Sequence, residues 1–173
     1  MDKEKLNEIL EKHKKWLNKE DGGECADLSS SDMRYSDLRG SDLRGSNLRG
    51  SNLSGSNLRG SNLSDSDLSH SDLRGSNLIH SDLSHSDLSG SNIDYACWPL
   101  WCGSLDAHID DRIARQLLYH LMRPCLVSPY VSDDFKRALF TKALIAEANK
   151  FHRAEECGLI ENPYGEDDHG QSN

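Results

Sequence analysis

The sequence is poor in apolar and aromatic residues and has no surplus of cations. Of its 173 residues, 35% are hydrophobic and 6% are aromatic, whereas ordinary globular domains are roughly 45–50% apolar. Its 20 Lys and Arg residues stand against 29 Asp and Glu, which gives a formal net charge of -9. A protein that coats nucleic acid needs excess cations to displace counterions from phosphates. That class is excluded, and we expect no direct nucleic-acid binding.

Long hydrophobic runs and targeting signals are also missing. No stretch approaches the ~18 apolar residues of a membrane span, and residues 1–20 are charged throughout, without the apolar centre of a secretory signal. The five cysteines form no dense disulfide framework. We therefore expect a cytoplasmic protein that does not contact a membrane.

Motifs of catalysis and metal binding are absent from the sequence. It has no phosphate-binding P-loop, no G-x-S-x-G nucleophile motif and no H-E-x-x-H zinc motif. The closely spaced cysteine pairs of zinc sites do not occur, so we interpret Cys97, Cys102, Cys125 and Cys157 as buried free thiols. The sequence thus predicts no catalytic residue, no metal site and no cofactor, and a protein that is not an enzyme.

Low hydrophobicity combined with net charge would indicate disorder, but a strict period of five excludes it. From residue 26 to residue 95 the chain consists of fourteen consecutive five-residue units, such as SDLRG at 36–40. In each unit a small residue, usually Ser, comes first, Asp or Asn second, and a large apolar residue third. The apolar residues predict a structural core column: Leu28, Met33, Leu38, Leu43, Leu48, Leu53, Leu58, Leu63, Leu68, Leu73, Leu78, Leu83, Leu88 and Ile93.

A period of five fits neither an α-helix at 3.6 residues nor a strand at 2. It fits a chain that turns a corner after every unit, with the apolar and the small residue inward and three residues outward. Four units then make a square coil of twenty residues, and stacked coils pair through backbone hydrogen bonds about 4.8 Å apart. A flexible Ser-rich linker would not place an apolar residue at every fifth position fourteen times.

The units resemble the A(D/N)LXX consensus of the pentapeptide repeat family. The resemblance covers residues 26–95, with a degenerate unit ACWPL at 96–100. It implies a β-solenoid, a right-handed quadrilateral β-helix of about 3.5–4 coils. The chain departs from the family in having Ser where Ala is usual. Because the serine hydroxyl enters the interior, it must find a backbone hydrogen-bond partner.

Amphipathic segments flank the repeats, as the open ends of a solenoid require. One helical face near the N-terminus is apolar, and Gly22–Gly23 is expected to end that helix. Behind the repeats, helices are expected at about 110–123, with Pro124 just beyond, and from 132 roughly to 153. The apolar residues of the first face are Leu6, Ile9, Leu10, His13, Trp16 and Leu17, and those of the helix at 110–123 are Ile109, Ile113, Leu117 and Leu121.

These elements predict four parts. They are an N-terminal capping helix (1–22), a β-helix (23–100), a C-terminal α-helical cap (101–160) and a polar, disordered tail (161–173). The bulky end-cap residues are Trp16, Trp98 and Trp101, with Leu100 beside them.

Stacking twenty residues per coil also places the outward side chains. His70, His80 and His85 fall on three different faces and do not converge, while Asp65 and His85 share a column and are interpreted as a surface pair. The one threonine, Thr141, lies outside the repeat, so the Thr rows of an ice-binding solenoid are absent.

Two functions stay open. The first is a non-enzymatic structural or protein-interaction scaffold with an unknown partner, including self-association through the C-terminal helices. The second comes from the resemblance, because one branch of the family confers quinolone resistance by imitating DNA and binding DNA gyrase, a type II topoisomerase. Residues 26–95 hold ten Asp and six Arg, a net charge of -4, with the arginines spread over the faces, and three and a half coils span only about 17 Å. We therefore favour the scaffold and keep the DNA mimic as the alternative.

Overall fold

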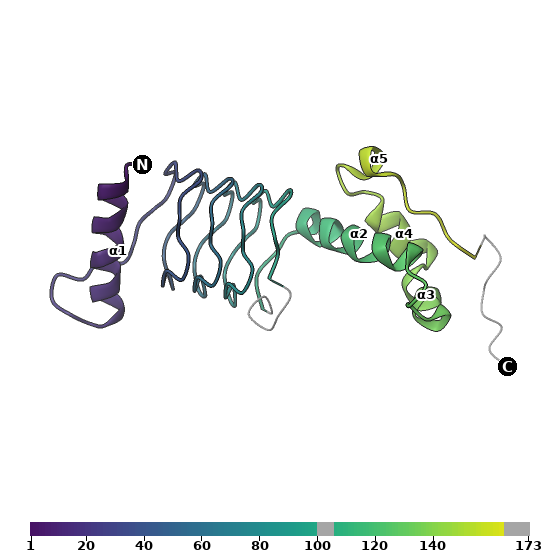
Figure 1. Ribbon diagram of the computed structural model, residues 1–173, viewed down its shortest axis with the longest axis horizontal. Coiled ribbons are helices and arrows are strands. Elements are labelled where there is room, and N and C mark those ends of the chain that lie inside the picture. The colour runs from purple at the N-terminus through teal and green to yellow at the C-terminus, as the bar shows by residue number, and fades with distance from the viewer. Residues whose placement is uncertain (100–105, 165–173) are drawn as a thin grey trace. The chain divides into compact units, whose positions relative to one another are not determined.

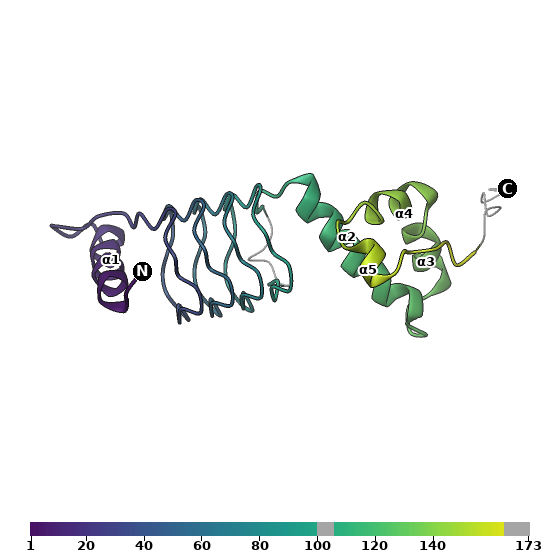
Figure 2. The same cartoon turned by 90° about the horizontal axis from the view of Figure 1, so that it is seen from above.

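The computed structural model describes residues 1–99 and 106–164 and divides into two compact units, one ending at Asp110 and one beginning at Asp111. The first unit contains helix α1 (Lys3–Leu17) and the repeat segment, which winds as a series of stacked coils (Figure 1). The second unit contains the four helices α2 to α5 (Figure 2). No described helix combines the length and apolar character needed to cross a membrane.

The coils pair in parallel with a spacing of twenty residues. Asp27, for example, bridges Asn47, and the backbone N–H of Leu48 donates to the carbonyl of Asp67 at 2.7 Å. Bridges at four positions per coil define four faces, as the sequence predicts. Face 1 joins Asp27, Asn47, Asp67, Asp87 and His108, face 2 joins Asp32, Asn52, Asp72 and Asn92, face 3 joins Asp37, Asn57, Asn77 and Cys97, and face 4 joins Asp42, Asn62 and Asp82.

The third residue of every unit fills the interior of the coils. All fourteen side chains from Leu28 to Ile93 are at most 4% exposed. They contribute a continuous apolar interior, in which each buried leucine stabilises the fold by roughly 1.5–3 kcal/mol.

A left-handed residue makes each corner. The fifth residue of the units adopts a positive φ, from +53° at Ser30 to +69° at Gly90. Because side chains disfavour this region, Gly is frequent at this place. The units that carry Tyr, Asp or His there project that side chain outward.

The interior serines follow the prediction only in part. Six hydroxyls donate to the main-chain carbonyl three residues back, at 2.5–2.7 Å: Ser31, Ser41, Ser61, Ser66, Ser81 and Ser86. The expectation is wrong for five other buried hydroxyls, which have no partner among the described residues: Ser46, Ser51, Ser56, Ser71 and Ser76. In all eleven units the same carbonyl also accepts the backbone N–H of the serine, as that of Leu43 does from Ser46, so this bond does not distinguish the two groups of serines.

The ladder continues past the repeats to His108, which bridges Asp87. This last step spans 21 residues rather than 20, and the Asp110 carboxylate accepts from the N–H of Gly90 at 2.6 Å. Of the bulky residues expected to cover this end, Trp98 is half-buried. Leu100 and Trp101 lie outside the described residues.

Helix α1 packs on the first coil through Leu6 and His13, which are buried. The expected end at Gly22–Gly23 is wrong, because the helix stops at Leu17 and Lys19 takes the left-handed φ of +58°. Gly23 serves another purpose, since a Cβ there would lie 2.3 Å from the backbone nitrogen of Trp16. The returning chain can therefore pass close to the helix.

The second unit differs from the expected helices in three ways. Helix α2 (Asp111–Val127) runs through Pro124 instead of ending before it. The expected second helix is broken into α3 (Asp133–Leu139) and α4 (Lys142–Ala148), because the Thr141 hydroxyl starts a new helix by accepting from the N–H of Leu144. The short helix α5 (Ala154–Cys157) follows.

The buried side of α2 is also not the predicted one. Ile113 is buried as expected, but Leu117 is only half-buried and Leu121 is exposed. Helix α2 contacts α3 and α4, and the core of this unit is made of Tyr119, Met122, Phe140, Ala148, Phe151, Ala154 and Ile160.

Candidate binding surface

One hydrogen bond of an outward side chain recurs in every unit of the coils. In all fourteen units, the Oδ1 atom of the second residue accepts from the backbone N–H two residues later, at 2.8–3.4 Å. Asp and Asn both supply this oxygen, so either can occupy the position. The surface charge can therefore vary from unit to unit without loss of the turn.

Sequence reasoning identified Asp or Asn at this place of every unit but missed this role. The restriction to Asp and Asn in every unit is the signal that could have revealed it, because Oδ1 is what these two side chains share.

Units of the form Asp-x-Arg contain a second recurring interaction, an ion pair between the two side chains. Four arginines hold the carboxylate two residues earlier through two parallel hydrogen bonds, with N–O distances of 2.5–2.9 Å. Hydrogen bonds from Arg34 and Arg39 lower the pKa of Asp32 and of Asp37 to about 2. These exposed pairs add little to stability, but they fix the direction of the guanidinium groups. The pairs are Asp32–Arg34, Asp37–Arg39, Asp42–Arg44 and Asp72–Arg74.

Units of the form Asn-x-Arg leave the arginine without a carboxylate. The Arg49 side chain reaches the Ser69 hydroxyl of the next coil at 3.1 Å. Arg59 follows Asn57, whose Oδ1 accepts from the backbone N–H of Arg59. Its guanidinium forms no ion pair within 1–99 and 106–164.

Aromatic side chains stand out on face 2. Tyr35 is 81% exposed and Tyr95 is 72% exposed, and both occupy the fifth place of their units. The Tyr35 ring lies over Gly55 of the next coil, where a Cβ would approach it to 2.6 Å. Exposed tyrosine beside arginine is the composition of protein-interaction surfaces.

Trp16 is another aromatic side chain that stays partly exposed, at the N-terminal end of the coils. Its ring stacks on that of His13 with 5.4 Å between centroids and lies against Gly45, but the side chain stays 43% exposed. It covers the edge of the coil rather than its interior. His13 itself is buried, its Nδ1 accepts from the N–H of Ala26 at 3.0 Å, and burial lowers its pKa. The sequence placed His13 on this face but gave no sign of that bond.

Histidines and cysteines do not form a site among the described residues. His70, His80 and His85 are exposed on faces 1, 3 and 4, and Asp65 shares a column of face 4 with His85 without a hydrogen bond between them. The predicted burial of the thiols is wrong for Cys97 and Cys157, which are exposed. Cys125 is half-buried, and Cys102 lies outside the described residues.

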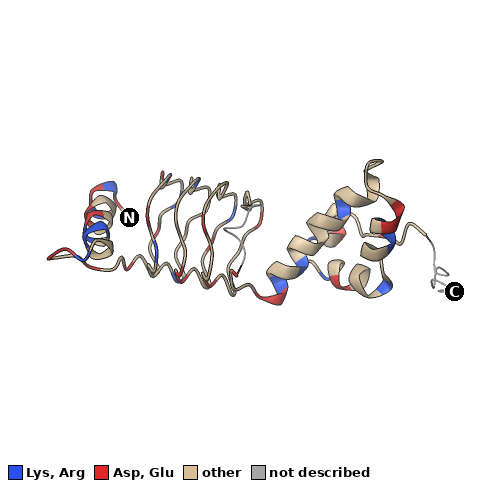
Figure 3. Ribbon diagram, turned by 90° about the horizontal axis from the view of Figure 1, so that it is seen from below, with Lys and Arg blue, Asp and Glu red and all other residues tan. Residues whose placement is uncertain are grey.

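No group of three or more His, Cys, Asp or Glu side chains within 1–99 and 106–164 could hold a metal ion. Charges of both signs are distributed along the coils (Figure 3). The exposed tyrosines and arginines described above therefore lie on the outer surface of the coils, and not around an internal site.

A family model described as pentapeptide repeats matches residues 24–60 and 56–94 with eight copies. Such repeats imply a right-handed quadrilateral β-helix, in agreement with the four-sided parallel ladder. No curated protein matches in sequence.

Among solved structures, a pentapeptide repeat protein from the Arabidopsis thaliana thylakoid lumen is 25% identical, with a TM-score of 0.44 over 54% of this chain and 71% of that one. Rfr23 from the cyanobacterium Cyanothece 51142 is 26% identical, with a TM-score of 0.42 over 49% of this chain and 53% of its own length. QnrB1, a plasmid-mediated fluoroquinolone resistance protein, is 18% identical, with a TM-score of 0.22 over 55% and 63%. The chain thus spans about half to three quarters of these relatives.

Proposed function

Residues 24–94 make this chain a pentapeptide repeat protein, and we propose that it works as a non-enzymatic scaffold that binds another protein through the outer surface of its coils. The observation that carries this proposal is the filled interior. Every side chain of the leucine column is at most 4% exposed, which leaves no room for a ligand inside. The side chains available for recognition all point outward.

The surface is also prepared for recognition. Hydrogen-bonded arginines such as Arg34 and Arg74 lose less freedom on binding than free ones. The exposed Tyr35 and Tyr95 on the same face provide large contact areas at a small entropic cost.

Helix α1 supports the scaffold as the cap of the first coil. The bond between His13 and Ala26, and that from the N–H of Glu24 to the Lys12 carbonyl at 3.1 Å, tie the helix to the chain entering the coil. We propose likewise that the solenoid comprises about four coils, and that the second unit either caps its far end or mediates self-association. Val127 and Tyr130 of that unit are exposed.

The DNA-mimic alternative is disfavoured by the ion pairs. Four of the ten repeat carboxylates are paired with arginine, so they do not present free negative charges at phosphate-like intervals. We expect micromolar protein to leave the supercoiling activity of DNA gyrase unchanged. Inhibition that is lost when Asp67, Asp82 and Asp87 are replaced by Asn would favour the mimic instead.

Site-specific photo-crosslinking in the native host tests the scaffold. A benzoylphenylalanine residue replaces Tyr35, Tyr95 or, in the second unit, Tyr130, each of which is at least 72% exposed. We expect one discrete protein adduct from Tyr35 or Tyr95. Adducts from Tyr130 alone would transfer the binding function to the helical unit, and no adduct from any coil position would contradict the proposal.

A further inference from the structure

Face 3 has an electrostatic character opposite to that of the other faces. Within residues 26–95 it carries two arginines, Arg39 and Arg59, and one carboxylate, Asp37. Each of the other three faces carries more carboxylates than arginines. The protein as a whole has a net charge of -9, so a net positive face on it calls for a reason. The residues of the other faces are Asp27, Asp67, Asp87 and Arg49 on face 1, Asp32, Asp72, Asp94, Arg34 and Arg74 on face 2, and Asp42, Asp65, Asp82 and Arg44 on face 4.

The two arginines of face 3 differ in how they are held. The Asp37 carboxylate accepts from Nε of Arg39 at 2.8 Å and from Nη2 at 2.6 Å, which fixes its direction. Arg59 lies one coil further along the same column and has Asn57 in place of a carboxylate. An anion from outside can therefore bind Arg59 without displacing a partner.

The column continues with an apolar side chain. In the column of Arg39 and Arg59, the coil that follows carries Ile79, whose side chain is 37% exposed. Its carbonyl accepts from the N–H of Gly60 in the preceding coil at 2.9 Å. We call Arg39, Arg59 and Ile79 the arginine strip. Beside it, Gly40 and Gly60 have open space where a Cβ would stand. A partner can approach the strip closely from that edge.

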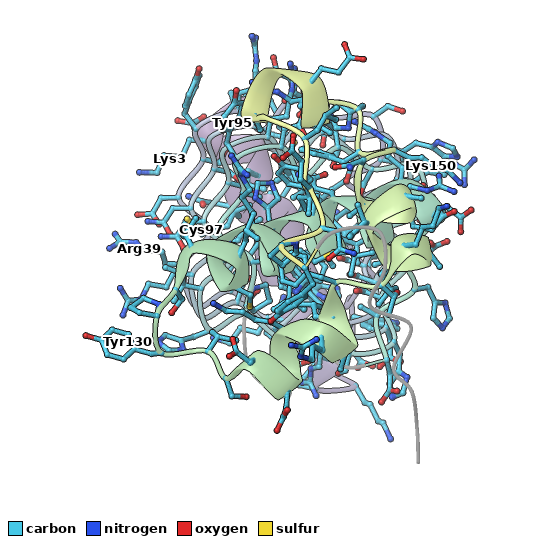
Figure 4. All side chains as sticks on the ribbon, turned by 90° about the vertical axis from the view of Figure 1, so that its right-hand side faces the viewer. Lys3, Arg39, Tyr95, Cys97, Tyr130 and Lys150 are labelled. Atoms are coloured by element: carbon cyan, nitrogen blue, oxygen red, sulfur yellow. The ribbon has the colours of Figure 1, made fainter. Side chains whose placement is uncertain are left out.

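Cationic character extends to the N-terminal end of the face. Viewed along the coils, Lys3 of α1, Arg39 and Cys97 project on the same side (Figure 4). Lys3 also contributes to lowering the pKa of Asp37, after the larger effect of Arg39. Lys3 and the arginine strip together present three cations followed by an apolar residue.

The spacing of the strip selects the partner's secondary structure. Successive coils are about 4.8 Å apart, and one turn of an α-helix rises about 5.4 Å. A helix lying along the coils would place the residues at i and i+4 opposite Arg39 and Arg59 and the residue at i+7 opposite Ile79. In an extended strand, side chains on one side are roughly 6.6 Å apart, so the match is lost after one step.

We propose that face 3 binds an acidic amphipathic α-helix of a partner protein, with two carboxylates on Arg39 and Arg59 and an apolar side chain on Ile79. This inference rests on the scaffold function and specifies its partner. Nucleic acid fits the same cations less well. Three cations neutralise about three phosphates, which gives weak binding at physiological salt, and the carboxylates of faces 2 and 4 on either side repel a long polyanion.

A synthetic helical peptide provides the probe. A fluorescein-labelled, alanine-rich 15-residue peptide carries Glu at i and i+4 and Leu at i+7, and a matched peptide has Gln in place of both Glu. Fluorescence anisotropy with the full chain in 50 mM NaCl should show saturable binding of the Glu peptide only. The double variant R39Q/R59Q should weaken it about 2- to 30-fold, the range expected for two exposed ion pairs.

The double variant R44Q/R49Q is the matched control, because it removes two arginines that lie outside face 3, on faces 4 and 1, and should change the affinity less than twofold. The proposal is overturned if the Glu peptide does not bind, or if both double variants weaken it equally. It also falls if a 20-bp DNA duplex binds more tightly at 150 mM NaCl through Arg39 and Arg59. A dimer in sedimentation that R39Q/R59Q dissociates would make the face an interface between two copies.

Failure of this inference can be separated from failure of the scaffold function. If the protein crosslinked at Tyr35 or Tyr95 also binds R39Q/R59Q with unchanged affinity, the scaffold stands and the assignment of face 3 is wrong. If no coil position gives an adduct, both fall together.

Discussion

The coils and the helical unit stabilise themselves by different means. In the coils the same kinds of residue recur at the first three places of every unit, the interior is a single column of side chains, and every unit repeats the same turn and Oδ1 bond. In the second unit a mixed core of aromatic and aliphatic residues around Tyr119 and Phe151 joins short helices. Regularity lets the first unit vary its surface freely, whereas the second depends on the fit of individual side chains.

The largest effect should come from a charge in the leucine column. Leu58→Asp places a carboxylate where the side chain is fully buried in an apolar column, at a cost of several kcal/mol. We expect the β-helix to unfold while the helical circular dichroism of α2 to α4 persists. Arg59→Ser, one residue away on the surface, should melt like the unaltered protein. Unchanged melting of Leu58→Asp would refute the inward column.

The corresponding substitution in the helical unit is made at Phe151, which packs on Tyr119 with 5.2 Å between ring centroids. Phe151→Ala should destabilise the helical unit by about 3–5 kcal/mol through the cavity it leaves. Hydrogen exchange should rise in α2 and α4 while the amide protons of the coils keep their protection. If protection falls equally in both units, they do not unfold independently and the contrast between them is lost.

Serine provides a test within the coils themselves. Replacing Ser51, Ser56 and Ser71 with Ala removes buried hydroxyls that have no partner among the described residues, and should stabilise the β-helix by about 1 kcal/mol per site. Ser61→Ala is the control, because its hydroxyl donates to the Leu58 carbonyl at 2.7 Å. Denaturant titration measures both. A triple variant less stable than the unaltered chain would show that these hydroxyls are bonded in solution.

The smallest effect should be that of two ion pairs on stability at acidic pH. The pKa of Asp32 and of Asp37 is about 2 in the folded protein, below the ordinary value of 3.8, because of their bonds to Arg34 and Arg39. Between about pH 4 and pH 2 the unfolded chain binds protons that the folded chain does not, so stability present above pH 4 is lost as the pH falls. The melting temperature of D32N/D37N should fall less steeply in this window. A slope identical to that of the unaltered chain would mean that the pairs do not persist.

The sequence specified the coils in detail because the physical cause repeats. A column position such as Leu58 or Leu83 could be placed inward from the period alone, and so could the shared columns of Arg39 with Arg59 and of Asp65 with His85. The bond from Asn52 or Asp67 to the following backbone was missed, because it requires the turn geometry as well as the period.

The structure of the helical unit was harder to predict from the sequence, for a physical reason. The sequence showed an apolar stripe through Leu117 and Leu121, but tertiary packing buries Gln116 and Tyr119 in its place. Thr141 interrupts a segment that otherwise has the composition of one helix. The ion-pair-free Arg59 on face 3 could be found only once the partner of each arginine was known.

Pyrene excimer emission tests the twenty-residue register that places Arg39 and Arg59 together. In a background with its five cysteines replaced by serine, cysteines are introduced at residues 39 and 59, or at 39 and 44 as the control, and labelled with pyrene maleimide. Stacked coils about 4.8 Å apart should bring the first pair into contact and give strong excimer emission, whereas residues 39 and 44 lie on adjoining faces and should give little. Equal emission from both pairs, or none from residues 39 and 59, would contradict the four-sided scaffold and the binding strip built on it.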